Sequence, residues 1–530
     1  MLAAVVAKVL FQESISTPGL IGIVLIVVGV VLCNFFWNES LNEDERGVIT
    51  LEQRIETFGA EKIFIAVFIV FGVMICFMRP PYQLMDEINH LPRAWQISEG
   101  IFLSPTMTIR EFAGLGDLRA RKIFDLSIAP ADAWNDKVYI AEVPVSFLPD
   151  NFITDANHKH NIQAFTVADI QTFLSTPLNA EEHEPIQIPN TGVYPPLTYL
   201  PQAAVAFIGR ALNLNAGIIF YLMGLSGLIF VAACVWWSMK FLPEAKPLIF
   251  LLAMMPMFIV EAASTSADAV TFGVCLLGAA WLLSLRNSTA RLSRGELVGL
   301  VVLSIMLACS KSVYGTILLL YFLIPRERVK HFWTLGAALL LLNLFLLSAW
   351  SWLSVELSDA ALYTNYYLGY TDRNLAAQKL FVMEHPLAFF AAMMNSFAEQ
   401  WVGYIAHFIG IWGFLWNVML SPWFYISYGL TIIFFALTNG LRLKLGERAL
   451  LVFAAAVSTF AFFFVHYLKW SPVGRNFIGG IQGRYFIPVA LMMFGALSIL
   501  PPMRHKNLIA LAAGVFSGVV MLLTNYIAFY

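Results

Sequence analysis

Charged residues are scarce in this sequence of 530 residues, because Asp, Glu, Lys and Arg make up 12% of it. Soluble chains carry about 25%. Hydrophobic residues make up 59%, and the mean hydropathy is +0.73. Such a chain has too little polar surface to cover a water-soluble fold, so its apolar excess must face lipid. These values exclude soluble, secreted, disordered, coiled-coil and DNA-binding proteins, and they predict an all-α integral membrane protein.

The sequence also has few cysteines, no excess of basic residues and no nucleotide-binding motif. The five cysteines form no CxxC pair and have no histidine at ligand spacing, so neither disulfides nor structural zinc are expected. They are Cys33, Cys76, Cys234, Cys275 and Cys309. The net charge of -2 offers no basic footprint for nucleic acid. No P-loop and no GxGxxG motif after a strand occurs, so the sequence carries no nucleotide signature.

Apolar segments, in contrast, recur along the whole chain. Many approach the roughly 20 residues that a helix needs to cross a bilayer, and together they predict about 12 transmembrane helices. The expected spans are 20–37, one that begins at Ile63, 217–240, 247–260, 268–285, 297–309, 312–324, 332–352, 424–438, 449–466, 485–500 and 508–529.

Two less apolar segments divide these spans into five regions. Two N-terminal spans occupy 1–78, a transmembrane bundle occupies 197–352, and C-terminal transmembrane helices occupy 423–530. Residues 79–196 are rich in Asp, Asn, Pro and Thr, and predict a large outer loop with interfacial helices that caps the bundle. Residues 353–422 predict a second outer loop. Its tryptophans, which include Trp401 and Trp412, suit helices that lie in the interface or re-enter the membrane.

Lysine and arginine in the short loops predict the orientation. The positive-inside rule places four basic clusters in the cytoplasm, at 286–294, 326–330, 442–448 and 504–506. The loops 79–196, 353–422 and 469–484 then lie outside, as do both termini. We therefore expect a multi-pass membrane protein whose functional site faces the outer side of the membrane.

Two acidic motifs lie at the outer ends of predicted spans. Asp86 and Glu87, in RPPYQLMDEINHLPR, form with His90 a fixed turn between a span and an interfacial helix. A carboxylate there can take a proton from a hydroxyl nucleophile as a general base; the alternative is two solvated loop charges. Asp268, in EAASTSADAV, either caps the next helix with its serines or lines the outer side, where it orients a sugar hydroxyl or holds a divalent cation.

Basic and aromatic residues lie on the same predicted side. Lys311 interrupts an apolar stretch, and it either binds a phosphate as a point charge or extends to lipid phosphates. Arg475 and Arg484 offer guanidinium groups for phosphate, among glycines that let a backbone approach a ligand, and Tyr485 adds an aromatic face. The alternative is a flexible loop with lipid-facing arginines. Tyr194, in a proline-rich segment with a structural role, brings an aromatic ring to the same edge.

Five strings in series carry a resemblance to a known family. PPYQLMDEINHLPRAWQISEG, YPPLTYLPQA, STSADA, SKSVYG and IQGRYFIP, over about residues 79–488, resemble a large bacterial family of polytopic membrane proteins catalogued as a domain of unknown function. That family looks similar in architecture to the GT-C glycosyltransferases, which use lipid-phosphate-linked sugars at the outer membrane face. The resemblance implies a GT-C-like fold in the bacterial inner (plasma) membrane, with the active site facing the periplasm or the cell exterior.

The resemblance also assigns roles to particular positions. It implies Asp86 and Glu87 as the acidic pair, with Asp86 as the base of an inverting transfer, and Asp268 and Lys311 as motif residues. His90 and Arg93 follow the acidic pair, and Gln482, Arg484 and Tyr485 belong to the Gln-Gly-Arg-Tyr signature. One departure is Ile88, where the family often has proline.

The expected function is therefore transfer of a sugar from a polyprenyl-phosphate donor to a cell-surface glycan or lipid acceptor. Lys311 and Arg484 would hold the donor phosphate while Asp86 deprotonates the acceptor hydroxyl. A cofactor is not specified, although a divalent cation is compatible with the acidic residues. The alternative is a non-catalytic flippase, exporter or assembly component for lipid-linked polysaccharide. Such a protein needs polar residues along several spans, for which Glu261, Asn343 and His407 are candidates.

Overall fold

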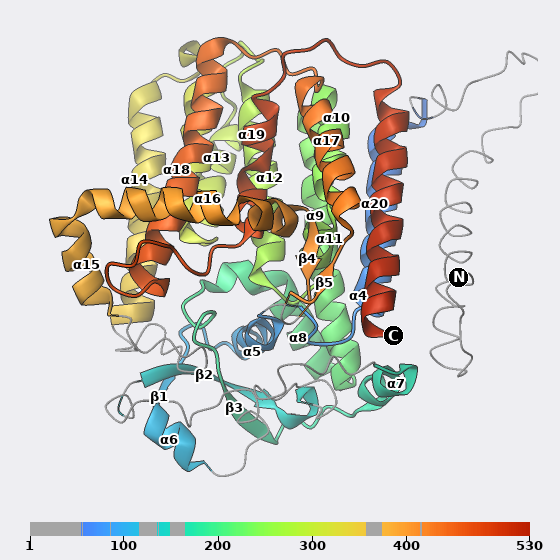
Figure 1. Ribbon diagram of the computed structural model, residues 1–530, viewed down its shortest axis with the longest axis vertical. Coiled ribbons are helices and arrows are strands. Elements are labelled where there is room, and N and C mark those ends of the chain that lie inside the picture. The colour runs from blue at the N-terminus through green and yellow to red at the C-terminus, as the bar shows by residue number, and fades with distance from the viewer. Residues whose placement is uncertain are drawn as a thin grey trace, which may run out of the picture.

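The computed structural model describes residues 55, 57–84, 86–115, 135, 137–148, 165–356, 374–413 and 416–530 (Figure 1). The first predicted span, at 20–37, lies outside these residues, as do parts of both predicted outer loops.

Long apolar helices run side by side and form a bundle (Figure 1). Within the described residues, six helices are long and apolar enough to cross a membrane. They are α4 (Ala60–Met78), α9 (Ala216–Phe241), α12 (Ala267–Leu285), α14 (Phe332–Ser351), α18 (Leu445–Trp470) and α20 (Lys506–Phe529). Helices α10 (Lys246–Ala253) and α11 (Pro256–Ala262) form a further apolar pair, which bends by 80°. Pro256 explains the break, because proline cannot donate to the preceding turn. The bundle confirms a mostly helical membrane protein.

The remaining predicted spans correspond to shorter elements. These are α13 (Arg294–Ala308), the 3-10 helix η7 (Ser312–Leu323), α17 (Pro422–Leu437), and the 3-10 helix η11 (Gly483–Val489) followed by α19 (Ala490–Gly495). Pro488 lies inside η11 and favours a break at this point. The number of about 12 spans therefore remains a prediction.

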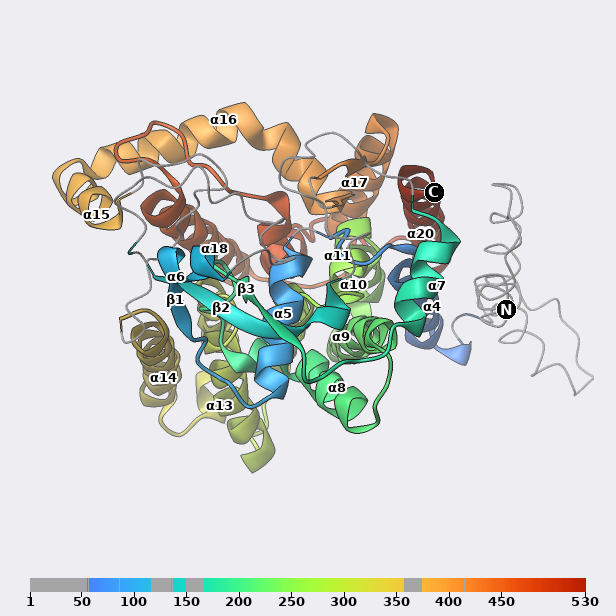
Figure 2. The same cartoon turned by 90° about the horizontal axis from the view of Figure 1, so that it is seen from below.

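A mixed α/β segment covers one end of the bundle (Figures 1 and 2). It contains α5 (Glu87–Ser98), β1 (Thr106–Thr108), α6 (Ile109–Gly114), β2 (Lys137–Pro144), α7 (Val167–Ser175), β3 (His183–Gln187), the 3-10 helix η5 (Pro196–Tyr199) and α8 (Leu200–Ala211). The three strands form an antiparallel sheet in the order β1-β2-β3, with Thr106 opposite Tyr139 and Ile140 opposite Gln187. These strands were not predicted from the sequence, although the valines, isoleucine and tyrosine of β2 favour a pleated, buried surface.

Helices α15 (Leu375–Glu384) and α16 (Pro386–Gly410) follow a different direction from the bundle. In Figure 1, α16 lies across the long helices, and in Figure 2 it runs along one side of the molecule. Short elements complete the described chain: η4 (Val145–Phe147), η6 (Pro243–Ala245), η8 (Arg326–Arg328), the π-helix η9 (Trp352–Glu356), β4 (Ile411–Trp412) and β5 (Val418–Met419).

The basic loops meet at the end of the bundle opposite the α/β segment (Figure 1). Arg286 lies 3.0 Å from Glu447 and donates to the carbonyl of Arg442. Arg328 lies 3.0 Å from Glu296, which is in the first turn of α13. The predicted cytoplasmic loops are therefore neighbours at one end, while the predicted site residues lie toward the other.

Candidate functional site

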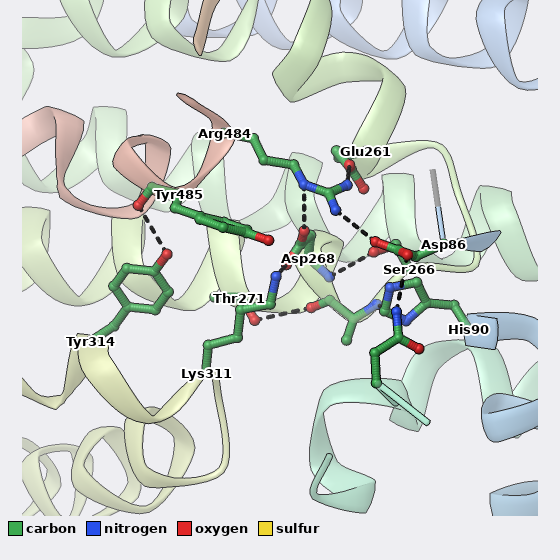
Figure 3. A network of polar contacts seen from close by, with 12 residues as sticks. Asp86, His90, Glu261, Ser266, Asp268, Thr271, Lys311, Tyr314, Arg484 and Tyr485 are labelled. Carbon is green, nitrogen blue, oxygen red and sulfur yellow. Dashed lines mark hydrogen bonds and ion pairs between the residues drawn. The ribbon is translucent and has the colours of Figure 1, made fainter. Parts of the chain in front are cut away.

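Arg484 is the centre of a buried network of ion pairs, which we call the Arg484 cluster (Figure 3). Its Nη1 lies 2.5 Å from Oε1 of Glu261, its Nη2 lies 2.9 Å from Oδ2 of Asp86, and its Nε lies 3.7 Å from Oδ2 of Asp268. Nζ of Lys311 lies 2.5 Å from Oδ1 of Asp268. Three carboxylates and two cations therefore converge from the turn before α5, from α11, from α12, from the residue that precedes η7, and from η11.

The backbone of Asp86 directs its side chain into this cluster. Asp86 precedes α5 with φ 64° and ψ 1°, a left-handed conformation that aspartate tolerates better than most residues. Its carbonyl accepts from the backbone N–H groups of Asn89 and His90 at 2.8 and 2.9 Å. The side chain does not cap α5 and is held instead by Arg484 and by Nδ2 of Asn190, which lies 2.9 Å from Oδ1. The side chain of Asp86 is 26% exposed, the most exposed of the three carboxylates.

Asp268 enters the cluster because a serine performs the capping. Oγ of Ser266 accepts from the backbone N–H of Asp268 at 3.1 Å and caps α12. Oγ of Ser264 donates to the carbonyl of Glu261 at 2.7 Å and so fixes the turn between α11 and α12. The predicted capping role therefore belongs to Ser266, and the side chain of Asp268 pairs with Lys311. Its place in the first turn of α12 also stabilises its negative charge.

Lys311 points into the protein instead of extending to lipid headgroups. Its ammonium lies 4.9 Å from the ring centroid of Tyr485 and 5.9 Å from that of Tyr194, and its side chain is 17% exposed. Burial lowers the pKa of Lys311, but the Asp268 carboxylate outweighs that effect and raises the pKa above its usual value. Lysine therefore stays charged here. An ammonium has three N–H donors. Asp268 is the oxygen partner found for it among the described residues, so donors remain for a ligand.

Glu87 lies apart from the cluster although it is the neighbour of Asp86. It forms a buried pair with Arg79, whose Nη1 and Nη2 lie 2.5 and 3.0 Å from its two carboxylate oxygens. Arg79 follows α4 directly, so the pair ties the end of this helix to the start of α5. The structure does not bring the Glu87 carboxylate together with that of Asp86 but places it against Arg79, outside the Arg484 cluster. Its expected catalytic role stays a prediction.

His90 and Arg93 support the cluster from α5. Nδ1 of His90 lies 2.7 Å from the hydroxyl of Tyr199, and its ring centroid lies 6.1 Å from that of Tyr194. Burial lowers the pKa of His90 to about 4, against the opposing effect of Asp86 and Asp268. Arg93 donates to the carbonyls of Phe102 and Tyr194 at 2.6 and 3.1 Å, and so holds the segment that carries Tyr194.

The Gln-Gly-Arg-Tyr signature explains how Arg484 reaches the centre. A Cβ at Gly483 would lie 1.9 Å from the carbonyl oxygen of Tyr404 and 2.5 Å from the backbone nitrogen of Phe408, both in α16. Only glycine allows this approach. The carbonyl of Tyr485 accepts from the hydroxyl of Tyr314 at 2.9 Å. Gln482 is half-buried before η11, and Arg475 is exposed in the preceding loop, outside the cluster.

The sequence did not assign Glu261 to the site, nor Asn190, which donates to Asp86 at the edge of the Arg484 cluster. Glu261 was expected only as part of the EAASTSADAV motif and as a polar group for a transport path. The signal for its role in the site is that a carboxylate in an apolar stretch is costly unless it is paired, and here it pairs with Arg484. Asn190 has no comparable signal, because an asparagine before a turn is common. No group of three or more His, Cys, Asp or Glu side chains in the described part of the chain is placed to hold a metal ion. The three carboxylates face Arg484 and Lys311 instead.

Comparison with known proteins identifies the family. No curated protein and no solved structure matches the chain. Residues 68–493, which include the whole Arg484 cluster, match the model of a family described as "Predicted membrane protein (DUF2142)". This match covers most of the chain, and the protein therefore belongs to that family of membrane proteins.

Proposed function

We propose that the protein is an integral membrane glycosyltransferase. It moves a sugar from a polyprenyl-phosphate donor to a hydroxyl of a cell-surface glycan or lipid on the outer side of the bacterial inner membrane. The observation that carries this proposal is the link between a partly exposed carboxylate, Asp86, and a partly exposed ammonium, Lys311, through Arg484 and Asp268. One ligand with a hydroxyl at Asp86 and a phosphate at Lys311 suits this pair.

The reaction is a single displacement. The acceptor oxygen forms a bond to the anomeric carbon, the bond from that carbon to the phosphate oxygen breaks, and polyprenyl phosphate leaves with both electrons of the broken bond. The hydroxyl proton passes to Asp86. Each oxygen of Asp86 has one hydrogen bond from Arg484 or Asn190. A carboxylate oxygen accepts two hydrogen bonds, so Asp86 can receive the acceptor hydroxyl without losing these partners.

The cations have separate roles in this mechanism. The Nη groups of Arg484 contact Glu261 and Asp86, so Arg484 is a positioning residue that holds the base. Lys311 has unfilled donors and binds the leaving phosphate, where a fixed positive charge stabilises the charge that develops. This revises the expectation that both cations hold the phosphate. The rings of Tyr194 and Tyr485 flank the ammonium and restrict its direction.

The depth of the cluster favours transfer over transport. Asp268 is in the first turn of α12, a helix of 19 residues. At 1.5 Å per residue, this helix is about 28 Å long, close to the thickness of the hydrocarbon core, so Asp268 lies near one membrane boundary. Transporters place their polar sites near the midplane. Two polar residues that could line a transport path have partners within the protein. Asn343 donates to the carbonyl of Ser304 at 2.9 Å, and the ring centroid of His407 lies 5.6 Å from that of Trp416. These contacts favour a structural role for both residues over a role in a transport path.

The test is transfer from a panel of polyprenyl-phosphate sugars, read as released polyprenyl phosphate with purified protein in lipid. Asp86→Asn is the suitable variant, because asparagine also tolerates the left-handed backbone. Loss of a general base lowers the rate about 100- to 10,000-fold. The matched control is Glu142→Gln, at an exposed position of β2, which keeps its rate. Full activity of Asp86→Asn removes the catalytic assignment.

A further inference from the structure

The outward face of α16 is a continuous apolar stripe. Leu387, Met394 and Trp401 are 77%, 61% and 57% exposed, and Phe390 and Ile405 extend the same stripe. The spacing of three, four and seven residues places these side chains on one side of a helix. The opposite side, with Phe389, Ala392 and Ser396, is buried against the protein. A soluble surface would not expose such a stripe, so it must be covered.

A third side of α16 is polar. Asn395 and Glu399 are exposed, and their helical positions lie between the apolar stripe and the buried side. Nδ2 of Asn395 donates to the carbonyl of Asn476, in the loop before η11, at 3.1 Å. A helix with one packed side, one apolar side and one polar edge suits a boundary between hydrocarbon and water.

Exposed tryptophans mark where this boundary lies. Trp333 in the first turn of α14 and Trp352 just after its end are both exposed. They are 19 residues apart, about 28 Å along the helix, which matches the hydrocarbon core of about 30 Å. Trp423 is exposed in the first turn of α17, at the end that α16 adjoins. Tryptophans collect at both membrane interfaces, so Trp401 and Trp423 indicate the interface nearer the Arg484 cluster.

We infer that α16 lies in the plane of the membrane, at the boundary between headgroups and acyl chains on the side of the Arg484 cluster, with its apolar stripe against lipid. Its 25 residues, about 37 Å, would suffice to cross the bilayer. Its direction across the long helices in Figures 1 and 2 supports the in-plane position. The backbone of α16 also contacts Gly483, so the membrane surface and Arg484 are linked through one rigid helix.

The test is the depth of spin labels in the full-length protein in phosphatidylcholine–phosphatidylglycerol vesicles, with a spin-labelled amino acid at position 387, 394 or 405. Contacts with oxygen and with an aqueous nickel chelate report the depth of each label. Positions 387 and 405 are about 27 Å apart along α16. The inference predicts one common depth, about 5–10 Å into the lipid. A label at 399 should contact the nickel chelate more strongly.

The matched control is α14, with labels at positions 333 and 344, both exposed in a helix that spans the bundle. Their depths should differ by about 16 Å. In a helix that crosses the membrane, labels at 387 and 405 would lie near opposite surfaces and the label at 394 would lie about 10 Å deeper than either. This result would overturn the inference. Labels at 387 and 405 in water would also overturn it. If the labels lose contact with oxygen and show dipolar coupling between two molecules, a second copy covers the stripe, and the inference is overturned as well.

Discussion

Replacing Gly483 by alanine should disable the site without touching any charged group. The added Cβ would lie 1.9 Å from the carbonyl oxygen of Tyr404, and real contacts stay beyond 3.0 Å. The backbone of η11 or α16 must therefore move by at least 1.1 Å, since no flexible side chain can give way. Arg484, the next residue in η11, lies 2.9 Å from Asp86, so a shift of η11 by this amount breaks their hydrogen bond.

The expected result is a transfer rate about 100-fold lower, which is the usual cost of a misplacement of about 1 Å. The free energy of unfolding should fall by about 1–3 kcal/mol, as expected for overpacking. Initial rates and denaturant titrations in detergent measure both quantities. Gly479→Ala is the control from the same loop, because its nearest atom, the carbonyl oxygen of Trp470, lies 3.8 Å away. A Gly483→Ala protein with the rate and stability of Gly479→Ala would refute this account of the motif.

Two further predictions concern buried groups of the cluster. Lys311→Met leaves the Asp268 carboxylate without its closest partner, and should lower the free energy of unfolding by about 3–5 kcal/mol. The double variant Lys311→Met with Asp268→Asn should recover most of the lost stability. It should still bind donor about 10- to 150-fold more weakly, and donor binding at the normal affinity would contradict the role of Lys311. His90 has a native pKa of about 4 and an unfolded pKa near 6.5, so the unfolded state binds the extra proton first on acidification. Stability should therefore fall by up to about 3 kcal/mol between pH 6.5 and pH 4, and this part of the slope should be missing in His90→Gln.

The sequence predicted the helical membrane class and the convergence of the acidic turn with the two cations. Low charge and repeated apolar segments determine the helical membrane class, because a bilayer requires helices of a known length. The convergence followed from topology, since the polar motifs all project from the same ends of the predicted spans. The structure confirms that Asp86 and Arg484, 398 residues apart, lie in contact.

The sequence could not predict which cation each carboxylate contacts. Glu87 and Asp86 are adjacent, yet Glu87 pairs with Arg79 and Asp86 with Arg484, because the left-handed backbone of Asp86 turns the two side chains apart. The number of spans does not follow from the sequence, because apolarity cannot distinguish a crossing helix from the bent pair α10 and α11. Likewise, α16 is as long as a span but lies across the bundle.

Transfer and donor binding measured together test the central proposal most directly. The protein, Asp86→Asn, and the double variant Lys311→Met with Asp268→Asn are each mixed with a labelled polyprenyl-phosphate sugar and an acceptor. We expect Asp86→Asn to bind donor as tightly as the unchanged protein but to release polyprenyl phosphate about 100- to 10,000-fold more slowly. We expect the double variant to bind donor about 10- to 150-fold more weakly. If Asp86→Asn transfers sugar at the full rate, or if the double variant binds donor normally, Asp86 and Lys311 do not act on one substrate.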